Sequence, residues 1–223
     1  MQIIETQLDS IDKIYHIADV HVRNVKRHKE YNLVFNRLYA YIKKTKTPNS
    51  LIYVAGDIVH AKTDMSPELI NMVSDFFRRL ADLAPTIVIT GNHDCNLNNS
   101  YRLDALSPII KALNHQNLHY LKDNGIYCIS GVHFNVMSVF DKPVDYIKAA
   151  DFEGDYKIAL HHGSVHNAST DAGFTLSNTH VTTEMFKGHD LSLLGDIHRP
   201  QFLDEEKTIA YAGSLVQQNH GEG

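Results

Sequence analysis

Side chains that can bind a metal ion stand at the ends of five short apolar runs of the sequence. The five groups are Asp19-Val20-His21, Gly56-Asp57, Gly91-Asn92-His93-Asp94, His161-His162-Gly163 and Gly195-Asp196-Ile197-His198. A single Asp or His at such a position is commonly a turn former or a capping residue. Five groups in succession are different, because carboxylates and imidazoles buried together are costly unless a cation neutralises them. The pattern therefore predicts a centre for divalent metal ions.

The donor types indicate which ions fit this centre. The seven candidate ligands are Asp19, His21, Asp57, Asn92, His161, Asp196 and His198. They combine imidazole, carboxylate and amide oxygen without thiolate, a set that suits Mn²⁺, with Mg²⁺, Fe²⁺ and Zn²⁺ as alternatives. Seven ligands imply two ions, and two ions about 3.5 to 4 Å apart need a bridging ligand. The two oxygens of Asp57 can bridge them.

His161 and His162 are adjacent, and neighbouring residues of a strand point to opposite faces of the sheet. Only one of the two can therefore face the metal centre. We interpret His161 as the ligand, with His162 as the alternative.

The elements that must position these groups are short strands alternating with helices. Residues 13–19, 50–57 and 86–92 are β-branched-rich apolar runs typical of buried strands. Further strands are expected at 118–121, 126–130, 134–139, 157–160, 191–194 and 208–211, and helices at 29–44, 67–83 and 101–114. This alternation predicts an α/β fold with parallel pairing, in which ligands bind beyond the carboxyl ends of the strands.

The order of the motifs resembles the calcineurin-like metallophosphoesterases from Asp19 to His198. The resemblance implies a four-layer α/β/β/α sandwich of two mixed sheets flanked by helices, and a hydroxide nucleophile that bridges two metal ions. The first ion would be held by Asp19, His21, Asp57 and His198, and the second by Asp57, Asn92, His161 and Asp196. His93 would face the substrate and protonate the leaving oxygen, and Asp94 would fix its tautomer. Most relatives have histidine at position 196, where this chain has a carboxylate that can also ligate.

A narrower resemblance concerns the substrate. The runs Gly56-Asp57-Ile58-Val59-His60, Gly195-Asp196-Ile197-His198-Arg199-Pro200 and Tyr211-Ala212-Gly213-Ser214 are similar to the SbcD-type DNA repair nucleases. The resemblance implies hydrolysis of DNA, as single strands or duplex ends, in repair or recombination, with His60 near the scissile phosphate. It also implies an SbcC-type coiled-coil ATPase as a partner. Because relatives continue into capping and ATPase-binding segments, we expect residues 1–223 to form the nuclease domain alone.

Charge and composition narrow the remaining choices. The net charge of −5 argues against binding nucleic acid through overall charge alone. The segment from Arg23 to Lys46, however, carries eight basic residues against the single acid Glu30, which permits a basic rim near one motif. The polar stretch from Gly163 to His180 is a long loop candidate of the kind that often carries function. The alternatives are a phosphatase or small-molecule phosphodiesterase on the same fold, or a non-catalytic scaffold.

Location is inferred from what the sequence lacks. No apolar run approaches the roughly 20 residues that span a bilayer, and no secretion signal is present. The two cysteines suit a reducing compartment. We expect a cytoplasmic, nucleoid-associated or nuclear protein that is not secreted and has no membrane partner.

Overall fold

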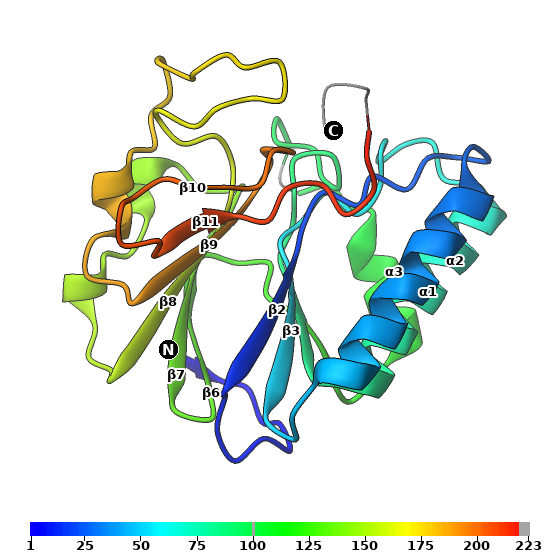
Figure 1. Cartoon of the computed structure of the whole chain (residues 1–223), viewed down its shortest axis with the longest axis horizontal. Coiled ribbons are helices and arrows are strands. Elements are labelled where there is room, and N and C mark those ends of the chain that lie inside the picture. The colour runs from blue at the N-terminus through cyan, green and yellow to red at the C-terminus, as the bar shows by residue number, and fades with distance from the viewer. Residues whose placement is uncertain (100, 219–223) are drawn as a thin grey trace.

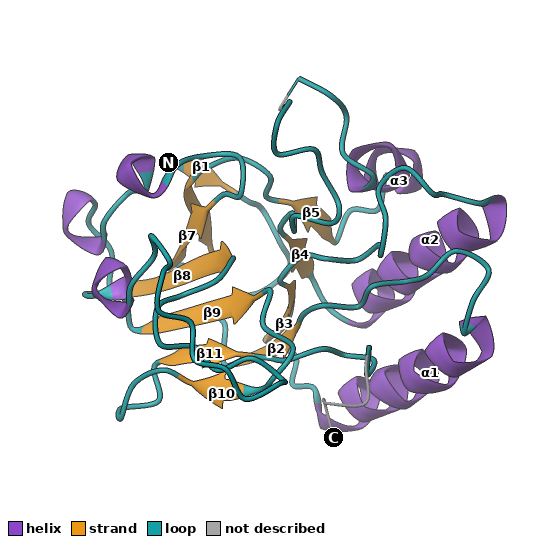
Figure 2. Cartoon of the chain, turned by 90° about the horizontal axis from the view of Figure 1, so that it is seen from above, coloured by secondary structure: helices purple, strands orange, loops and turns teal. Residues whose placement is uncertain are grey.

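Two β-sheets lie face to face between helical layers (Figures 1 and 2). The structure is a computed structural model that describes residues 1–99 and 101–218. The smaller sheet is parallel throughout, in the order β2 (Lys13–Ile17), β3 (Ser50–Val54), β4 (Thr86–Val88) and β5 (Leu118–Tyr120). These strands are the apolar runs that the sequence predicts, and β2, β3 and β4 each end a few residues before a group of candidate ligands.

Three α-helices cover the outer face of the smaller sheet (Figure 2). They are α1 (His28–Thr45), α2 (Pro67–Leu83) and α3 (Leu106–Leu113). Helix α2 begins as its sequence predicts, because Ser66 Oγ accepts the backbone N–H of Leu69. Helix α3 is shorter than expected because Asp104 accepts the N–H groups of Leu106 and Ser107 and starts the helix there.

The larger sheet has seven strands and is mixed. Its order is β1 (Gln2–Ile3), β6 (Gly125–Ile129), β7 (Val132–Met137), β8 (Tyr156–His162), β9 (Leu191–Gly195), β11 (Ile209–Tyr211) and β10 (Gln201–Phe202). The pairs β6·β7 and β10·β11 are antiparallel, and the other neighbours are parallel. The two-residue strands β1 and β10 were not predicted, because so short a run carries no readable periodicity.

The outer face of the larger sheet is covered by short 3₁₀-helices and loops. These helices are η1 (Pro143–Asp145), η2 (Ala149–Asp151) and η3 (Thr183–Phe186). The predicted α/β class with two sheets flanked by helices is confirmed. Among the described residues, no helix is both long and apolar enough to cross a membrane.

Successive side chains of a strand point to opposite faces of the sheet, so the larger sheet has a separate hydrophobic core on each side. On β8, Ile158 and Leu160 pack into the core between the two sheets, together with Tyr53 of β3 and Phe134 of β7. Ala159 packs instead into the outer cluster below the 3₁₀-helices. Residues of even number on β8 therefore face the smaller sheet, and residues of odd number face away from it.

Candidate metal centre

Four of the candidate ligand residues leave their strands in left-handed backbone conformations. The φ angles are 51° at Asp19, 48° at His21, 53° at Asp57 and 99° at Asp196. Residues other than glycine rarely adopt such angles, and those that do concentrate at functional sites. The turns are fixed by hydrogen bonds between segments, in which the N–H of His21 donates to the Asp57 carbonyl and the N–H of Asp196 donates to the Asp19 carboxylate. The ends of β2, β3 and β9 are therefore joined at one place.

The carboxylate of Asp57 lies between two histidines, one on each oxygen. Its Oδ2 is 3.5 Å from His21 Nε2 and its Oδ1 is 3.4 Å from His162 Nε2. His21 Nε2 is also 3.1 Å from His198 Nε2. Three groups of donor atoms in this arrangement could each hold an ion, namely Asp19 with His21 and His198, Asp19 with Asp57 and His162, and His21 with His60 and His93. The first two share the Asp19 carboxylate. The residues present therefore fit a pair of divalent ions bridged by a carboxylate.

His162, and not His161, faces this centre. His162 has the same parity on β8 as Ile158 and Leu160, so its ring points between the sheets, and its Nε2 is 3.0 Å from Asn92 Oδ1. His161 points to the opposite face, where its Nδ1 lies 3.1 Å from the Met137 carbonyl and its ring lies near Phe186. The interpretation of His161 as the ligand is thus corrected by strand alternation.

Asp196 lies at the margin of the centre. Its Oδ1 is 3.9 Å from His162 Nε2, while its Oδ2 accepts a 2.6 Å hydrogen bond from the hydroxyl of Ser164. One oxygen thus remains turned toward the centre, on the side of His162 and Asn92. The aspartate at this position is therefore compatible with the ligand role that was predicted for it.

The electrostatics of the cluster follow from burial and from mutual interaction. Burial raises the pKa of Asp19 to about 7, although the nearby His162 opposes the rise. Burial also lowers the pKa of His21 to about 3, so this ring is neutral and can donate a lone pair. Burial disfavours charge on His162, but Asp57 and the other carboxylates outweigh it and raise the His162 pKa well above its usual value. Buried carboxylates that depend on one imidazolium for compensation favour bound cations.

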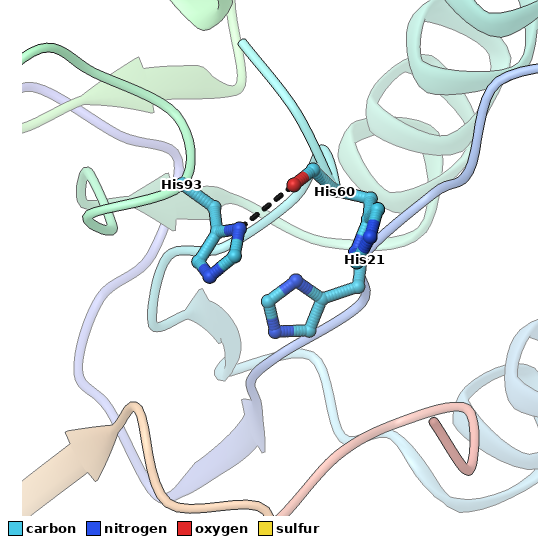
Figure 3. A group of neighbouring side chains, drawn as sticks. All are labelled: His21, His60 and His93. Atoms are coloured by element: carbon cyan, nitrogen blue, oxygen red, sulfur yellow. Dashed lines mark hydrogen bonds between the residues drawn. The ribbon is translucent and has the colours of Figure 1, made fainter. Parts of the chain in front are cut away.

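His21, His60 and His93 surround one side of the centre (Figure 3). The His93 ring is 4.7 Å from that of His21 and is stacked on that of His60 at 5.8 Å. His93 Nδ1 lies 2.7 Å from the His60 carbonyl oxygen, to which it donates a hydrogen bond. The Nδ1–H tautomer leaves Nε2 available for a substrate.

Asp94 does not contact His93. Its two oxygens accept the backbone N–H groups of Ile58, Val59 and Gly91, and the residue is fully buried. The predicted role of Asp94 in fixing the His93 tautomer is therefore wrong, and the His60 carbonyl takes that role. Asp94 instead ties the turn after β4 to the turn after β3.

The predicted residues line an open pocket of about 270 Å³. Its walls are His21, Arg23, Asp57, His60, His93, Asp196, His198 and Gln218. Arg23 belongs to the basic segment noted in the sequence, but Gln218 carried no signal there. The two side chains are held together, since Arg23 Nε donates to Gln218 Oε1 at 3.4 Å. A returning chain segment therefore completes the wall, which only the three-dimensional structure reveals.

Comparison with known proteins places these observations in a wider group. The sequence model of the calcineurin-like phosphoesterase family matches residues 12–200. Uncharacterized protein R555 of Acanthamoeba polyphaga mimivirus is 48% identical over 222 residues, which cover 95% of this chain and 16% of R555. The chain thus spans about a sixth of the length of that relative.

Among solved structures, the crystal structure of Pseudomonas putida nuclease MPE matches with a TM-score of 0.35 and 17% sequence identity. The match covers 72% of this chain and 65% of that chain. A score at this level supports no inference about this chain.

Proposed function

The chain belongs to the calcineurin-like phosphoesterases, a family of metal-dependent hydrolases, and from this membership together with the basic side chains beside the pocket we propose that it hydrolyses phosphodiester bonds of DNA in repair or recombination. One ion would be held by Asp19, His21, Asp57 and His198, and a second by Asp57, Asn92, His162 and Asp196. Mn²⁺ fits this mixture of hard oxygen and imidazole donors best. The observation that carries the proposal is the Asp57 carboxylate, which has a histidine beside each of its oxygens. The His93 ring lies nearby, with Nδ1 bonded to the His60 carbonyl and Nε2 available for a substrate.

Two divalent ions bound at this centre would supply Lewis acidity and lower the pKa of a water molecule. The other steps fall to the chain's own side chains. His93 holds its Nδ1 proton against the His60 carbonyl, so its Nε2 is the nitrogen that takes up a proton from water and, in the imidazolium form, gives it to the leaving oxygen. Because the His60 ring is stacked on that of His93, it limits the positions that the His93 ring can take.

A polymeric substrate is supported by the surroundings of the pocket. Arg23 lies in its wall, and Lys26 and Lys29 are exposed on the segment that leads from there into α1. Arg27 of the same segment is already engaged by Glu30 and by the Gln217 carbonyl. Lys26 and Lys29 are therefore the side chains that we propose contact DNA phosphates.

A cleavage assay with manganese tests the proposal. We expect hydrolysis of labelled single-stranded DNA or of duplex ends, with little activity toward phosphate monoesters, and we expect loss of activity on metal chelation. The control variant Asp57→Asn removes the bridging carboxylate charge and is expected to be inactive. Hydrolysis of small phosphate esters without cleavage of any DNA substrate would replace the proposal with a phosphatase or small-molecule phosphodiesterase.

The basic segment gives a separate prediction. The double variant Lys26→Gln/Lys29→Gln is expected to weaken single-stranded DNA binding and to flatten the plot of log affinity against log salt by about 0.7 for each lost contact. The matched control is Lys43→Gln/Lys44→Gln, which makes the same charge change about 22 Å away along α1. Equal slopes of log affinity against log salt in the two double variants would show that Lys26 and Lys29 do not contact DNA phosphates.

A further inference from the structure

The long loop after β8 is tied down at several points. Strand β10 fastens it through Gln201, whose side chain accepts the N–H of Ser169 and donates to the Ser169 carbonyl. Its two sides pair at Val165 and Val181, and the Val165 N–H donates to the Tyr211 hydroxyl. The predicted loop is thus an ordered arm that returns to the ends of β9 and β11.

This arm brings one carboxylate to the metal centre. Asp171 Oδ2 lies 3.7 Å from His198 Nδ1, and both side chains are largely buried, with 16% and 21% of their surfaces exposed. Asp171 Oδ1 is also buried and has no hydrogen-bond partner within the described part of the chain. The carboxylate is therefore directed at the His198 ring and at no other group that would explain its burial.

The far side of the same ring carries the proposed ligand atom. His198 Nε2 lies 3.1 Å from His21 Nε2, and Asp19 completes that group of donors. A neutral imidazole has a proton on one nitrogen and a lone pair on the other, so the partner of one nitrogen determines the chemistry of the other. A carboxylate beside Nδ1 favours the tautomer whose Nε2 lone pair faces His21.

We propose that Asp171 is a positioning residue that fixes the tautomer and orientation of His198 for the ion shared with Asp19 and His21. The inference rests on the proposed function, because it assigns Asp171 to the same metal centre. The inference concerns one of the two proposed ions, because Asp171 contacts His198, whereas the second donor group contains Asp57 and His162 and not His198.

Manganese titration of the metal-free full chain, followed by calorimetry, tests this assignment. Loss of an outer partner of a ligating histidine typically costs about 10- to 100-fold in metal affinity. We expect Asp171→Ala to weaken one of two binding steps by that factor and to leave the other unchanged. Asp171→Asn is expected to lose less, because its amide oxygen still places a partial negative charge beside Nδ1. The exposed Asp155→Asn is the charge-matched control and is expected to bind as the wild type does.

The possible outcomes separate this inference from the proposed function. Two unchanged steps in Asp171→Ala, or an equal loss in both steps, would overturn the positioning role while leaving the metal centre in place. If Asp171→Ala does not fold, the Asp171→Asn variant replaces it in the test. Manganese affinities unchanged in both binding steps of a folded Asp171→Asn protein would contradict a role for the Asp171 charge. Failure of the wild-type chain to bind manganese would refute the proposed function, and this inference with it. Manganese binding without DNA cleavage would refute only the proposed substrate.

Discussion

Asparagine in place of His162 is expected to remove the second manganese ion and to reduce phosphodiester hydrolysis by more than about 100-fold. The reason is geometric, since His162 Nε2 is the atom that faces Asp57 Oδ1 and Asn92 Oδ1. The loss should exceed the range of about 10- to 100-fold that is typical of residues that only support a ligand. Calorimetric manganese titration and the rate of DNA cleavage measure it.

The neighbouring variant His161→Asn is the matched control. It changes the same side chain one residue earlier, on the face that packs against Tyr146 and Phe186. Removal of the His161 imidazole should lower the free energy of unfolding by about 1 to 3 kcal/mol, as is typical for a disrupted buried polar group. Both manganese-binding steps should persist. Loss of manganese binding in His161→Asn with retention in His162→Asn would reverse the assignment.

His93→Asn is expected to reduce turnover of DNA by about 10²- to 10⁴-fold, the usual contribution of a positioned general acid or base. Manganese binding is expected to persist, because the two donor groups that contain carboxylates do not include His93, although His93 lies with His21 and His60 in a third group of histidines. A nitrophenyl phosphodiester should show a much smaller loss, since its leaving oxygen is a weak base that needs little protonation. The comparison of the two substrates therefore reports the role of His93 directly.

A control histidine is available outside the centre. His115, which pairs with Asp82 at 3.1 Å, can be changed to asparagine with the expectation of unaltered turnover on both substrates. Equal losses on DNA and on the nitrophenyl ester in His93→Asn would contradict a role in leaving-group protonation. They would indicate instead that His93 contributes to binding of the phosphate.

The sequence predicts the strand ends and the donor types well, because both are local properties. It could not decide between His161 and His162. Strand β8 is buried on both faces from Ile158 onward. Its sequence therefore shows no alternation of polar and apolar residues that would tell which of its side chains point between the two sheets. Only the packing of Ile158 and Leu160 against the smaller sheet resolves the choice.

The wrong role for Asp94 and the absence of Asp171 from the predicted site have a common origin in long-range contacts. Asp94 accepts N–H groups of Ile58 and Val59 from the preceding turn, more than thirty residues earlier in the chain. Asp171 reaches His198 on an arm that Gln201 and Tyr211 hold in place. Spacing in the sequence reports neither contact. The single-domain organisation of residues 1–223, the ATPase partner and the cellular location stay predictions.

Anomalous diffraction from manganese-soaked crystals, recorded above and below the manganese absorption edge, decides whether two ions bind at Asp57. Two anomalous peaks about 3.5 to 4 Å apart are expected, on either side of the Asp57 carboxylate. One peak should lie beside His21 and His198, and the other beside His162 and Asn92. A map with no peak at Asp57, or with a peak coordinated by His161, would contradict this expectation.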